Sequence, residues 1–208
     1  MKSNILYRIS VALLNLSYRL TGGLICVDRH NVPETGGVIL APNHISYADP
    51  PAVGCGLRRQ VHCMAKEELF RFPLGVWMRA VGAFPVRRGP ADRKALKRAI
   101  QLLKEGRTVC IFPEGTRSPD GRLQAPELGI SLVALRSRAP VVPVAVIGSD
   151  KVLPPHTLRP RRHRIRIVYG RPLTFPDLYE AGESRKALEE IGRRTMAAIA
   201  DLLAKHAP

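Results

Sequence analysis

Two polar clusters, each directly after a run of apolar residues, contain the side chains best suited to chemistry in this chain. The first spans residues 43–49 and contains His44 and Asp49. An imidazole held by a carboxylate on one ring nitrogen can accept a proton from a hydroxyl group on the other. Five residues turn a regular helix by about 140°, so the two side chains would not share a helix face. Because Asp49 precedes Pro50, which disfavours helical backbone at Asp49 itself, we expect a tight turn that folds Asp49 back onto the imidazole.

The same two residues also fit a purely structural interpretation. Asp49 stands where a carboxylate would cap a helix that begins at Pro50, and His44 stands where it would satisfy the end of a strand. Spacing does not decide between this interpretation and general-base catalysis.

The second polar cluster spans residues 112–118. Pro113 and Gly115 bracket a turn whose backbone N–H groups can face a ligand, and the Arg117 guanidinium has the fork geometry that suits a phosphate. A third segment, residues 82–89, presents Arg87 and Arg88 after another short apolar run. Arginine-bearing turns after successive strands indicate an anion site.

The elements that must position these clusters alternate along the chain. Apolar runs predict strands over 36–42, 61–66, 108–112 and 141–148, and an alternating pattern predicts a half-exposed strand over 164–170. Amphipathic patterns predict helices over 91–106, 126–138 and 183–205. This alternation is typical of an α/β fold with a largely parallel or mixed sheet flanked by helices. The polar clusters would then lie beyond the carboxyl ends of the strands, where such folds place their ligands.

The composition limits the class of protein and its partners. The 208 residues are 45% hydrophobic, which excludes a disordered, collagen-like or coiled-coil chain. The 33 Lys and Arg against 17 Asp and Glu give a net charge of +16, which favours anionic partners. Phosphate-loop, dinucleotide, zinc-protease and nucleophilic-serine motifs are absent from the sequence, as is any CxxC pair, so we expect neither a metal nor a cofactor. We expect a reducing compartment, with Cys110 as a buried free thiol.

The N-terminal residues have a helical period with one apolar face and cationic flanks. Two interpretations stay open for this face: a helix lying in a membrane interface, or a surface helix docked on the protein's own core. We expect an N-terminal membrane-interface segment over residues 1–28 and a catalytic domain over 29–208. The sequence has no run apolar enough to span a bilayer. The residues of the apolar face are Ile5, Ile9, Ala12, Leu13, Leu16 and Leu20.

A second basic region runs from residue 151 to residue 171 without any Asp or Glu. It fits a solvated sheet edge, contact with anionic lipid headgroups, or docking of an acidic carrier protein. Its basic residues are Lys151, Arg159, Arg161, Arg162, Arg164, Arg166 and Arg171.

Several segments together resemble the 1-acylglycerol-3-phosphate acyltransferases and their relatives among the glycerolipid acyltransferases. HISYAD (44–49) matches the family's HxxxxD motif, and FPEGTRS (112–118) matches its third motif almost letter for letter. GAFPVRRG (82–89) and VVPVAV (141–146) resemble the second and fourth motifs, and MAKEEL (64–69) resembles the stretch between the first two. All occur in the family's order. The family often has a lysine soon after the third motif, which residues 124–129 lack.

The resemblance implies a glycerolipid acyltransferase-like fold and an acyl transfer from an acyl-carrier protein or acyl-CoA to 1-acylglycerol 3-phosphate, giving phosphatidic acid. His44 would be the general base and Asp49 would orient it, without an acyl-enzyme. The remaining site residues would bind the acceptor, whose phosphate would contact two arginines. They are Lys66, Arg87, Glu114, Gly115, Thr116 and Arg117.

Other acceptors and other functions fit the same sequence. A different lysophospholipid, a lyso-aminolipid or glycerol 3-phosphate could replace the acceptor, and the charge alone also suits a basic membrane-surface or nucleic-acid-binding module. No pattern typical of a specific nucleic-acid-binding fold is present. We expect a peripheral or monotopic protein on the cytoplasmic face of the cell membrane.

Overall fold

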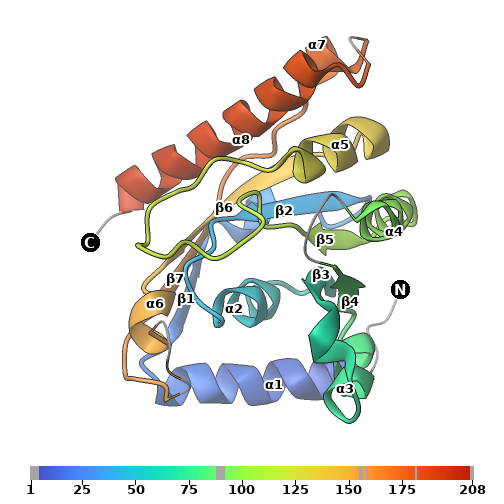
Figure 1. The fold of residues 1–208 in the computed structure, drawn as a ribbon. Helices are drawn as coiled ribbons and strands as arrows, with labels where there is room; N and C mark the ends of the chain where they lie inside the picture. Colours follow the sequence, from blue (N-terminus) through green and yellow to red (C-terminus); the bar gives the residue numbers. More distant parts are fainter. Residues whose placement is uncertain (1–4, 88–91, 155–156, 158, 181, 207–208) are drawn as a thin grey trace.

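A seven-stranded sheet forms the centre of the molecule (Figure 1). A computed structural model describes residues 5–87, 92–154, 157, 159–180 and 182–206. The strand order is β1-β7-β6-β2-β5-β3-β4, and every neighbouring pair is parallel except β6 and β7. The strands are β1 (Leu24–Val27), β2 (Val38–Pro42), β3 (Val61–Lys66), β4 (Phe84–Val86), β5 (Thr108–Cys110), β6 (Val141–Ile147) and β7 (Ile165–Tyr169).

Helices cover both faces of this sheet (Figure 1). One face is covered by α4 (Arg93–Lys104), α5 (Leu128–Ser137) and α8 (Arg185–His206), and the other by α2 (Asp49–Cys55) with α1 (Ile5–Leu20) beyond it. The shorter elements are α3 (Leu74–Ala80), α6 (Ser149–Val152), α7 (Pro176–Tyr179) and the 3₁₀ helices η1 (Arg29–Asn31) and η2 (Glu67–Phe70).

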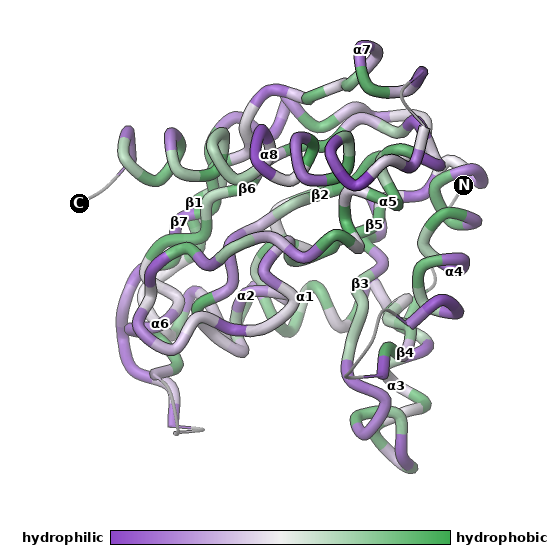
Figure 2. Tube along the Cα trace, turned by 45° about the horizontal axis from the view of Figure 1, so that its top comes forward, coloured by the Kyte–Doolittle hydropathy of each residue, from purple (hydrophilic) through white to green (hydrophobic). Residues whose placement is uncertain are grey.

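Two apolar cores form because successive side chains of a strand point to opposite faces. In β2, Ile39 packs with α4, α5 and α8, whereas Val38 and Leu40 pack with α1 and α2. All five residues of β2 are buried, which explains its uninterrupted apolar sequence. Figure 2 shows apolar residues along these strands between the two helical layers.

The predicted α/β architecture and most of its elements are confirmed, with β5 shorter than the predicted 108–112. The prediction of a half-exposed strand over 164–170 is wrong, because β7 lies inside the sheet between β1 and β6 and four of its five residues are buried. Its outer neighbour β1 has no counterpart in the sequence-based prediction, and it falls within the predicted N-terminal segment 1–28. Cys110 is a buried free cysteine, as expected.

Helix α1 packs on the rest of the chain through the face opposite to its apolar one. Tyr18 and Tyr7 are buried and donate hydrogen bonds from their hydroxyl groups to Ala48 O (3.2 Å) and Arg59 O (3.4 Å). Buried Ser10 accepts a hydrogen bond from Trp77 Nε1 at 2.9 Å. The interpretation in which the apolar face of α1 docks on the protein's own core is therefore wrong.

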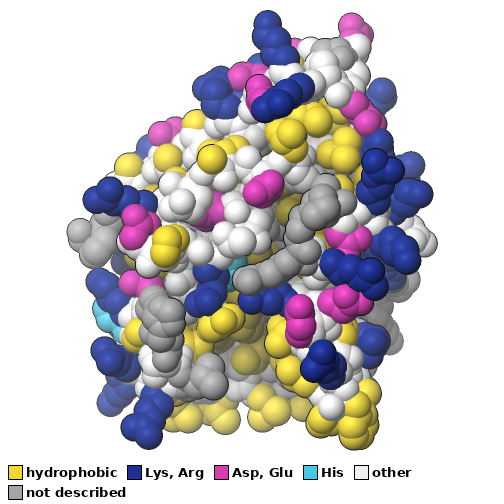
Figure 3. Space-filling model, in the orientation of Figure 1, with side chains coloured by type: hydrophobic (Ala, Val, Ile, Leu, Met, Phe, Trp, Pro, Cys, Tyr) yellow, Lys and Arg dark blue, Asp and Glu magenta, His cyan; other side chains and the backbone are white. Residues whose placement is uncertain are grey.

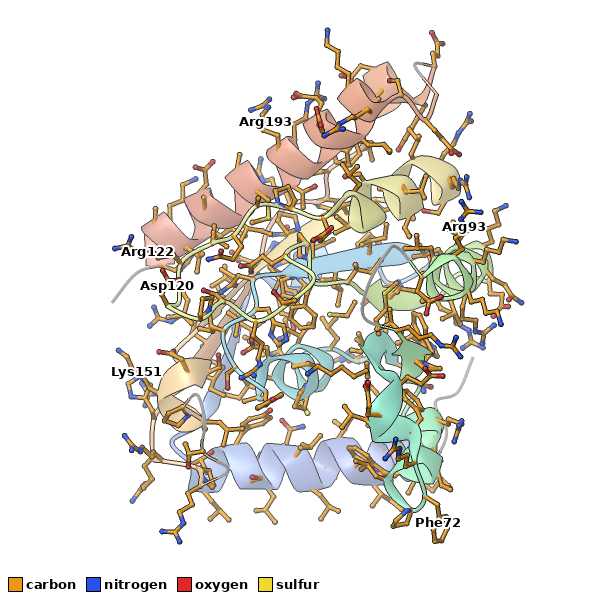
Figure 4. The ribbon with its side chains drawn as sticks, viewed as in Figure 1. Phe72, Arg93, Asp120, Arg122, Lys151 and Arg193 are labelled. Carbon is orange, nitrogen blue, oxygen red and sulfur yellow. The ribbon has the colours of Figure 1, made fainter. Side chains whose placement is uncertain are left out.

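The apolar face of α1 points away from the protein (Figure 4). Phe72, which is 89% exposed, projects on the same side of the molecule. No helix in the described part of the chain has the length and hydropathy needed to cross a membrane. The exposed large residues of the α1 apolar face are Ile5, Ile9, Leu13, Leu16 and Leu20, with exposed fractions of 67%, 49%, 62%, 54% and 68%.

Candidate active site

The turn after β2 brings His44 and Asp49 together. Nδ1 of His44 lies 2.8 Å from Oδ2 of Asp49, and the same oxygen accepts hydrogen bonds from the backbone N–H groups of Ile45 (2.7 Å) and Ser46 (2.8 Å). Asp49 is fully buried, while the His44 side chain remains 16% exposed. The predicted tight turn is confirmed.

The interpretation of Asp49 as a helix cap is wrong. Asp49 is the first residue of α2, the capping position belongs to Ala48, and no side chain caps the helix. The carboxylate instead bonds backward, to the turn that contains His44. When Nδ1 donates its proton to this carboxylate, Nε2 is the ring atom left to accept one, which is the arrangement that general-base catalysis requires.

The loop after β5 holds the His44 turn at three points. The Phe112 ring stacks on the imidazole with a centroid distance of 4.0 Å, and the Ser118 N–H donates to His44 O at 2.7 Å. Oε1 of Glu114 accepts the His44 N–H at 2.8 Å. The sheet explains this proximity, because β2 and β5 are parallel neighbours and their carboxyl ends meet at one edge.

Glu114 acts within the scaffold of this site. Its second carboxylate oxygen, Oε2, accepts the Gln124 N–H at 2.9 Å, so the side chain joins the His44 turn to the segment after the third motif. Burial raises the pKa of Glu114, and the hydrogen bonds from Gln124 and His44 oppose that rise. The sequence resemblance assigned Glu114 to acceptor binding, whereas both of its oxygens contact backbone N–H groups of the protein.

Gly115 and Thr116 form the exposed tip of the same loop. Gly115 has a φ of +67°, and a Cβ atom there would lie 2.9 Å from Cγ of Glu127. Both observations favour glycine at this position.

Arg117 extends from this loop over Tyr47. Its guanidinium carbon lies 3.6 Å from the centroid of the Tyr47 ring, a cation–π contact that fixes the charge without neutralising it. Within the part of the chain that the structure describes, no carboxylate pairs with Arg117. Its N–H donors are therefore available to an anionic ligand.

Arg87 has a different environment. Its Nε and Nη2 donate to the two carboxylate oxygens of Glu67, at 2.8 and 3.3 Å. Lys66 ends β3 and is in register with Val86 of β4, so Lys66 and Arg87 lie at the same edge of the sheet as His44. Arg87 lines a cavity of about 360 Å³, and the other lining residues are Glu67, Pro85, Asp92, Arg93 and Lys94. Neither His44 nor Arg117 lines that cavity, and Arg88 lies outside the described residues.

Several residues that support the site were not predicted from the sequence. The Asn43 side chain exchanges two hydrogen bonds with the backbone of Val146, at 3.0 and 2.7 Å, and so continues the pairing of β2 with β6. Ser46 Oγ donates to Leu153 O at 2.9 Å. Their positions beside His44 were the only signal in the sequence.

In the space-filling view, a histidine surface is recessed between basic side chains near the middle of one face (Figure 3).

Comparisons with known proteins agree with this geometry. The model of the Acyltransferase family matches residues 24–147, which include both polar clusters. The chain belongs to the acyltransferase family. A 1-acyl-sn-glycerol-3-phosphate acyltransferase of Bacillus subtilis is 34% identical over 177 residues, covering 83% of this chain and 84% of the relative. This confirms the resemblance found in the sequence and identifies the chain as an O-acyltransferase rather than a nucleic-acid-binding module.

Other relatives extend the comparison. A chloroplastic 1-acyl-sn-glycerol-3-phosphate acyltransferase of Arabidopsis thaliana is 32% identical over 69% of this chain, which spans 41% of that longer protein. A lyso-ornithine lipid O-acyltransferase of Pseudomonas aeruginosa is 31% identical over 72% of this chain and 64% of the relative. The fold is shared with the crystal structure of the 1-acyl-sn-glycerophosphate acyltransferase PlsC from Thermotoga maritima. The TM-score is 0.78 at 22% identity, with coverage of 97% of this chain and 80% of that one.

Proposed function

We propose that this acyltransferase moves a fatty acyl group from a thioester to the free hydroxyl of 1-acylglycerol 3-phosphate, giving phosphatidic acid for phospholipid synthesis. The observation that carries the proposal is the His44–Asp49 pair, in which the buried carboxylate accepts from Nδ1 and leaves Nε2 of the partly exposed imidazole as the atom that can take a proton. The names of the Bacillus and Arabidopsis relatives support this acceptor.

In the proposed reaction, Nε2 of His44 takes the proton from the acceptor hydroxyl while the oxygen of that hydroxyl attacks the carbonyl carbon of the thioester. Asp49 holds the ring and offsets the positive charge that develops on it. The tetrahedral intermediate then collapses, the carbon–sulfur bond breaks, and the thiol takes the proton from His44. The products are an ester and a free thiol, with no acyl-enzyme. A backbone N–H or Lys66 would stabilise the oxyanion.

Arg117 would bind the acceptor phosphate, because its guanidinium lies next to the His44 turn and has no carboxylate partner among the described residues. Arg87, which follows β4, would contribute only by exchanging Glu67 for the phosphate, since it now forms an exposed ion pair with that residue. Gly115 and Thr116 would shape the pocket that holds this phosphate. The donor would be an acyl-carrier protein or acyl-CoA.

The protein would lie on an anionic membrane, at the cytoplasmic face, with the α1 apolar face in the lipid interface. The basic region 151–171 would add electrostatic attraction. His163 N–H donates to Thr21 O at 2.7 Å, which places part of this region beside the end of α1. Arg166 differs from its neighbours, because it donates a hydrogen bond to His206 O at 3.2 Å within the protein.

A second acceptor is suggested by the Pseudomonas relative, whose name specifies a lyso-ornithine lipid. Such an aminolipid has no phosphate for Arg117 to bind, so the unpaired guanidinium favours 1-acylglycerol 3-phosphate.

Product analysis by mass spectrometry tests the proposal. Purified protein is incubated with acyl-CoA or acyl-carrier protein and with 1-acylglycerol 3-phosphate, glycerol 3-phosphate, other lysophospholipids or lyso-ornithine lipid. We expect phosphatidic acid as the main product and its loss in His44→Ala. A folded His44→Ala protein with the wild-type rate would remove the assigned base. Arg117→Ala should raise KM for the phosphate-bearing acceptor with little change in kcat.

A further inference from the structure

The outer face of α4 carries a concentrated positive charge that the proposed reaction does not use. The inner face of the helix packs on the core through Ala95, Ala99, Leu102 and Leu103. We call the opposite face the α4 surface. Its exposed basic residues are Arg93, Lys94, Lys97, Arg98 and Lys104.

Few acidic groups compensate this charge. Asp92 accepts hydrogen bonds from the backbone N–H groups of Lys94 and Ala95, at 2.9 and 3.2 Å, as the cap of the helix. Glu105 lies 3.9 Å from Arg98 and also accepts from Gln101 at 3.0 Å. Three lysines of the α4 surface have no carboxylate partner among the residues that the structure describes.

The position of the α4 surface separates it from the proposed lipid-facing side. Helix α4 follows β4, so its first residues lie near the sheet edge that carries the His44 turn, and Arg93 and Lys94 line the cavity that also contains Arg87. Figures 1 and 4 place α4 across the sheet from α1. In Figure 3, basic side chains gather at the right, over the α4 flank, whereas hydrophobic side chains line the lower edge, where α1 lies.

We propose that the α4 surface docks an acidic carrier protein that delivers the acyl thioester. This inference rests on the proposed function, which requires a thioester donor. The helix has 12 residues and is about 18 Å long, so its charges extend further than a single phosphate group could contact. A carrier bound there would have its flexible acyl arm at the edge of the sheet where His44 lies. Complementary charge would speed their association and set their orientation.

Charge reversal tests this docking surface. Lys97→Glu/Arg98→Glu changes two exposed residues outside the cavity, and Lys186→Glu/Lys205→Glu makes the same change in net charge on exposed positions of α8. Each protein is assayed with a fixed acceptor in detergent micelles and three donors: an acyl-carrier protein thioester, acyl-CoA and the uncharged acyl thioester of N-acetylcysteamine.

We expect the α4 variant to raise KM for the carrier-protein donor about tenfold, with kcat unchanged, because interface charges act mainly on association. KM for the uncharged donor should stay at the wild-type value in both variants. Calorimetric titration of the carrier protein should show the same weakening, and wild-type binding should weaken with added salt.

Three results would overturn the proposal. An unchanged KM for the carrier-protein donor would remove the docking surface. An equal rise in KM for acyl-CoA would assign the surface to polyanions in general. An equal rise in KM for the carrier-protein donor in the α8 variant would show that the change follows from net charge and not from the α4 surface. If the wild-type protein transfers no acyl group to any acceptor, the proposed function fails, and the titration still tests the surface by itself.

Discussion

The exposed leucines of α1 allow an estimate of how strongly this helix would bind a membrane. We expect Leu13→Ala/Leu16→Ala to weaken binding to lipid vesicles. These side chains are 62% and 54% exposed, so more than half of each is available to the lipid. Each substitution removes three carbon atoms, and a buried methylene contributes about 0.8 kcal/mol. Multiplied by the exposed fraction of each side chain, this gives roughly 1.4 kcal/mol of lost membrane-binding free energy per site. The pair would lower the partition coefficient by as much as about 100-fold, and by less where the helix stays shallow in the interface.

Vesicle sedimentation measures this effect. Vesicles containing anionic lipid are sedimented with wild-type protein, the α1 variant and Leu128→Ala, which removes the same atoms from a 41% exposed leucine on α5, across the sheet from α1. The control should bind as the wild type does, and the thermal midpoint of the α1 variant should not fall, because its leucines are not in the core. Equal sedimentation of wild-type and α1-variant protein would refute the assignment of this face to lipid.

Substitutions at three further positions test the turn and the loop. Asp49→Asn should lower kcat by at least about 10²-fold, because the charge that faces the imidazole is lost, and a near-normal kcat would contradict that role. Tyr47→Ala should raise KM for the phosphate-bearing acceptor as Arg117→Ala does, whereas Tyr47→Phe should retain the ring contact and the wild-type KM; loss in both variants would assign Tyr47 to its hydroxyl instead. Glu114→Gln places an amide opposite a backbone N–H and should destabilise the fold by about 1–3 kcal/mol. Because the folded-state pKa of Glu114 lies above its ordinary value, its contribution to stability is largest at acid pH and declines as the pH rises through that raised pKa. Denaturant titrations over this range should show the decline in the wild type and not in Glu114→Gln.

Much of this architecture could be predicted because buried parallel strands leave a strong signal. Val38–Pro42 and Val141–Ile147 are continuous apolar runs, and each is covered on both faces. The contact between His44 and Asp49 was predictable from their spacing, because a regular helix would place two side chains five residues apart on different faces and a turn is needed to join them. The expected effect of Pro50 on the Asp49 backbone was wrong, since Asp49 is the first residue of α2 and the turn lies before it. The sequence therefore contained both the layers of the fold and the contact between His44 and Asp49.

The remaining features depend on which neighbour occupies each side of an element. β7 alternates in sequence, yet β1 covers its outer edge and Arg166 reaches the end of α8. For α1, the periodicity identifies the apolar face but not its direction, which is set by the tertiary contacts of Tyr7 and Tyr18. The two hydrogen bonds that Glu114 accepts from His44 and Gln124 could not be predicted either, because the donors are backbone N–H groups that almost any residue would supply.

The interlocking of the two loops limits how this site can be re-engineered. The His44 carbonyl, the His44 N–H and the imidazole face are each held by a different residue of the segment 112–118. A chimera that takes only one of the two loops from a relative would not preserve these contacts, even if His44 and Asp49 were both retained. Transferring both loops together would keep the three contacts that hold His44 in place.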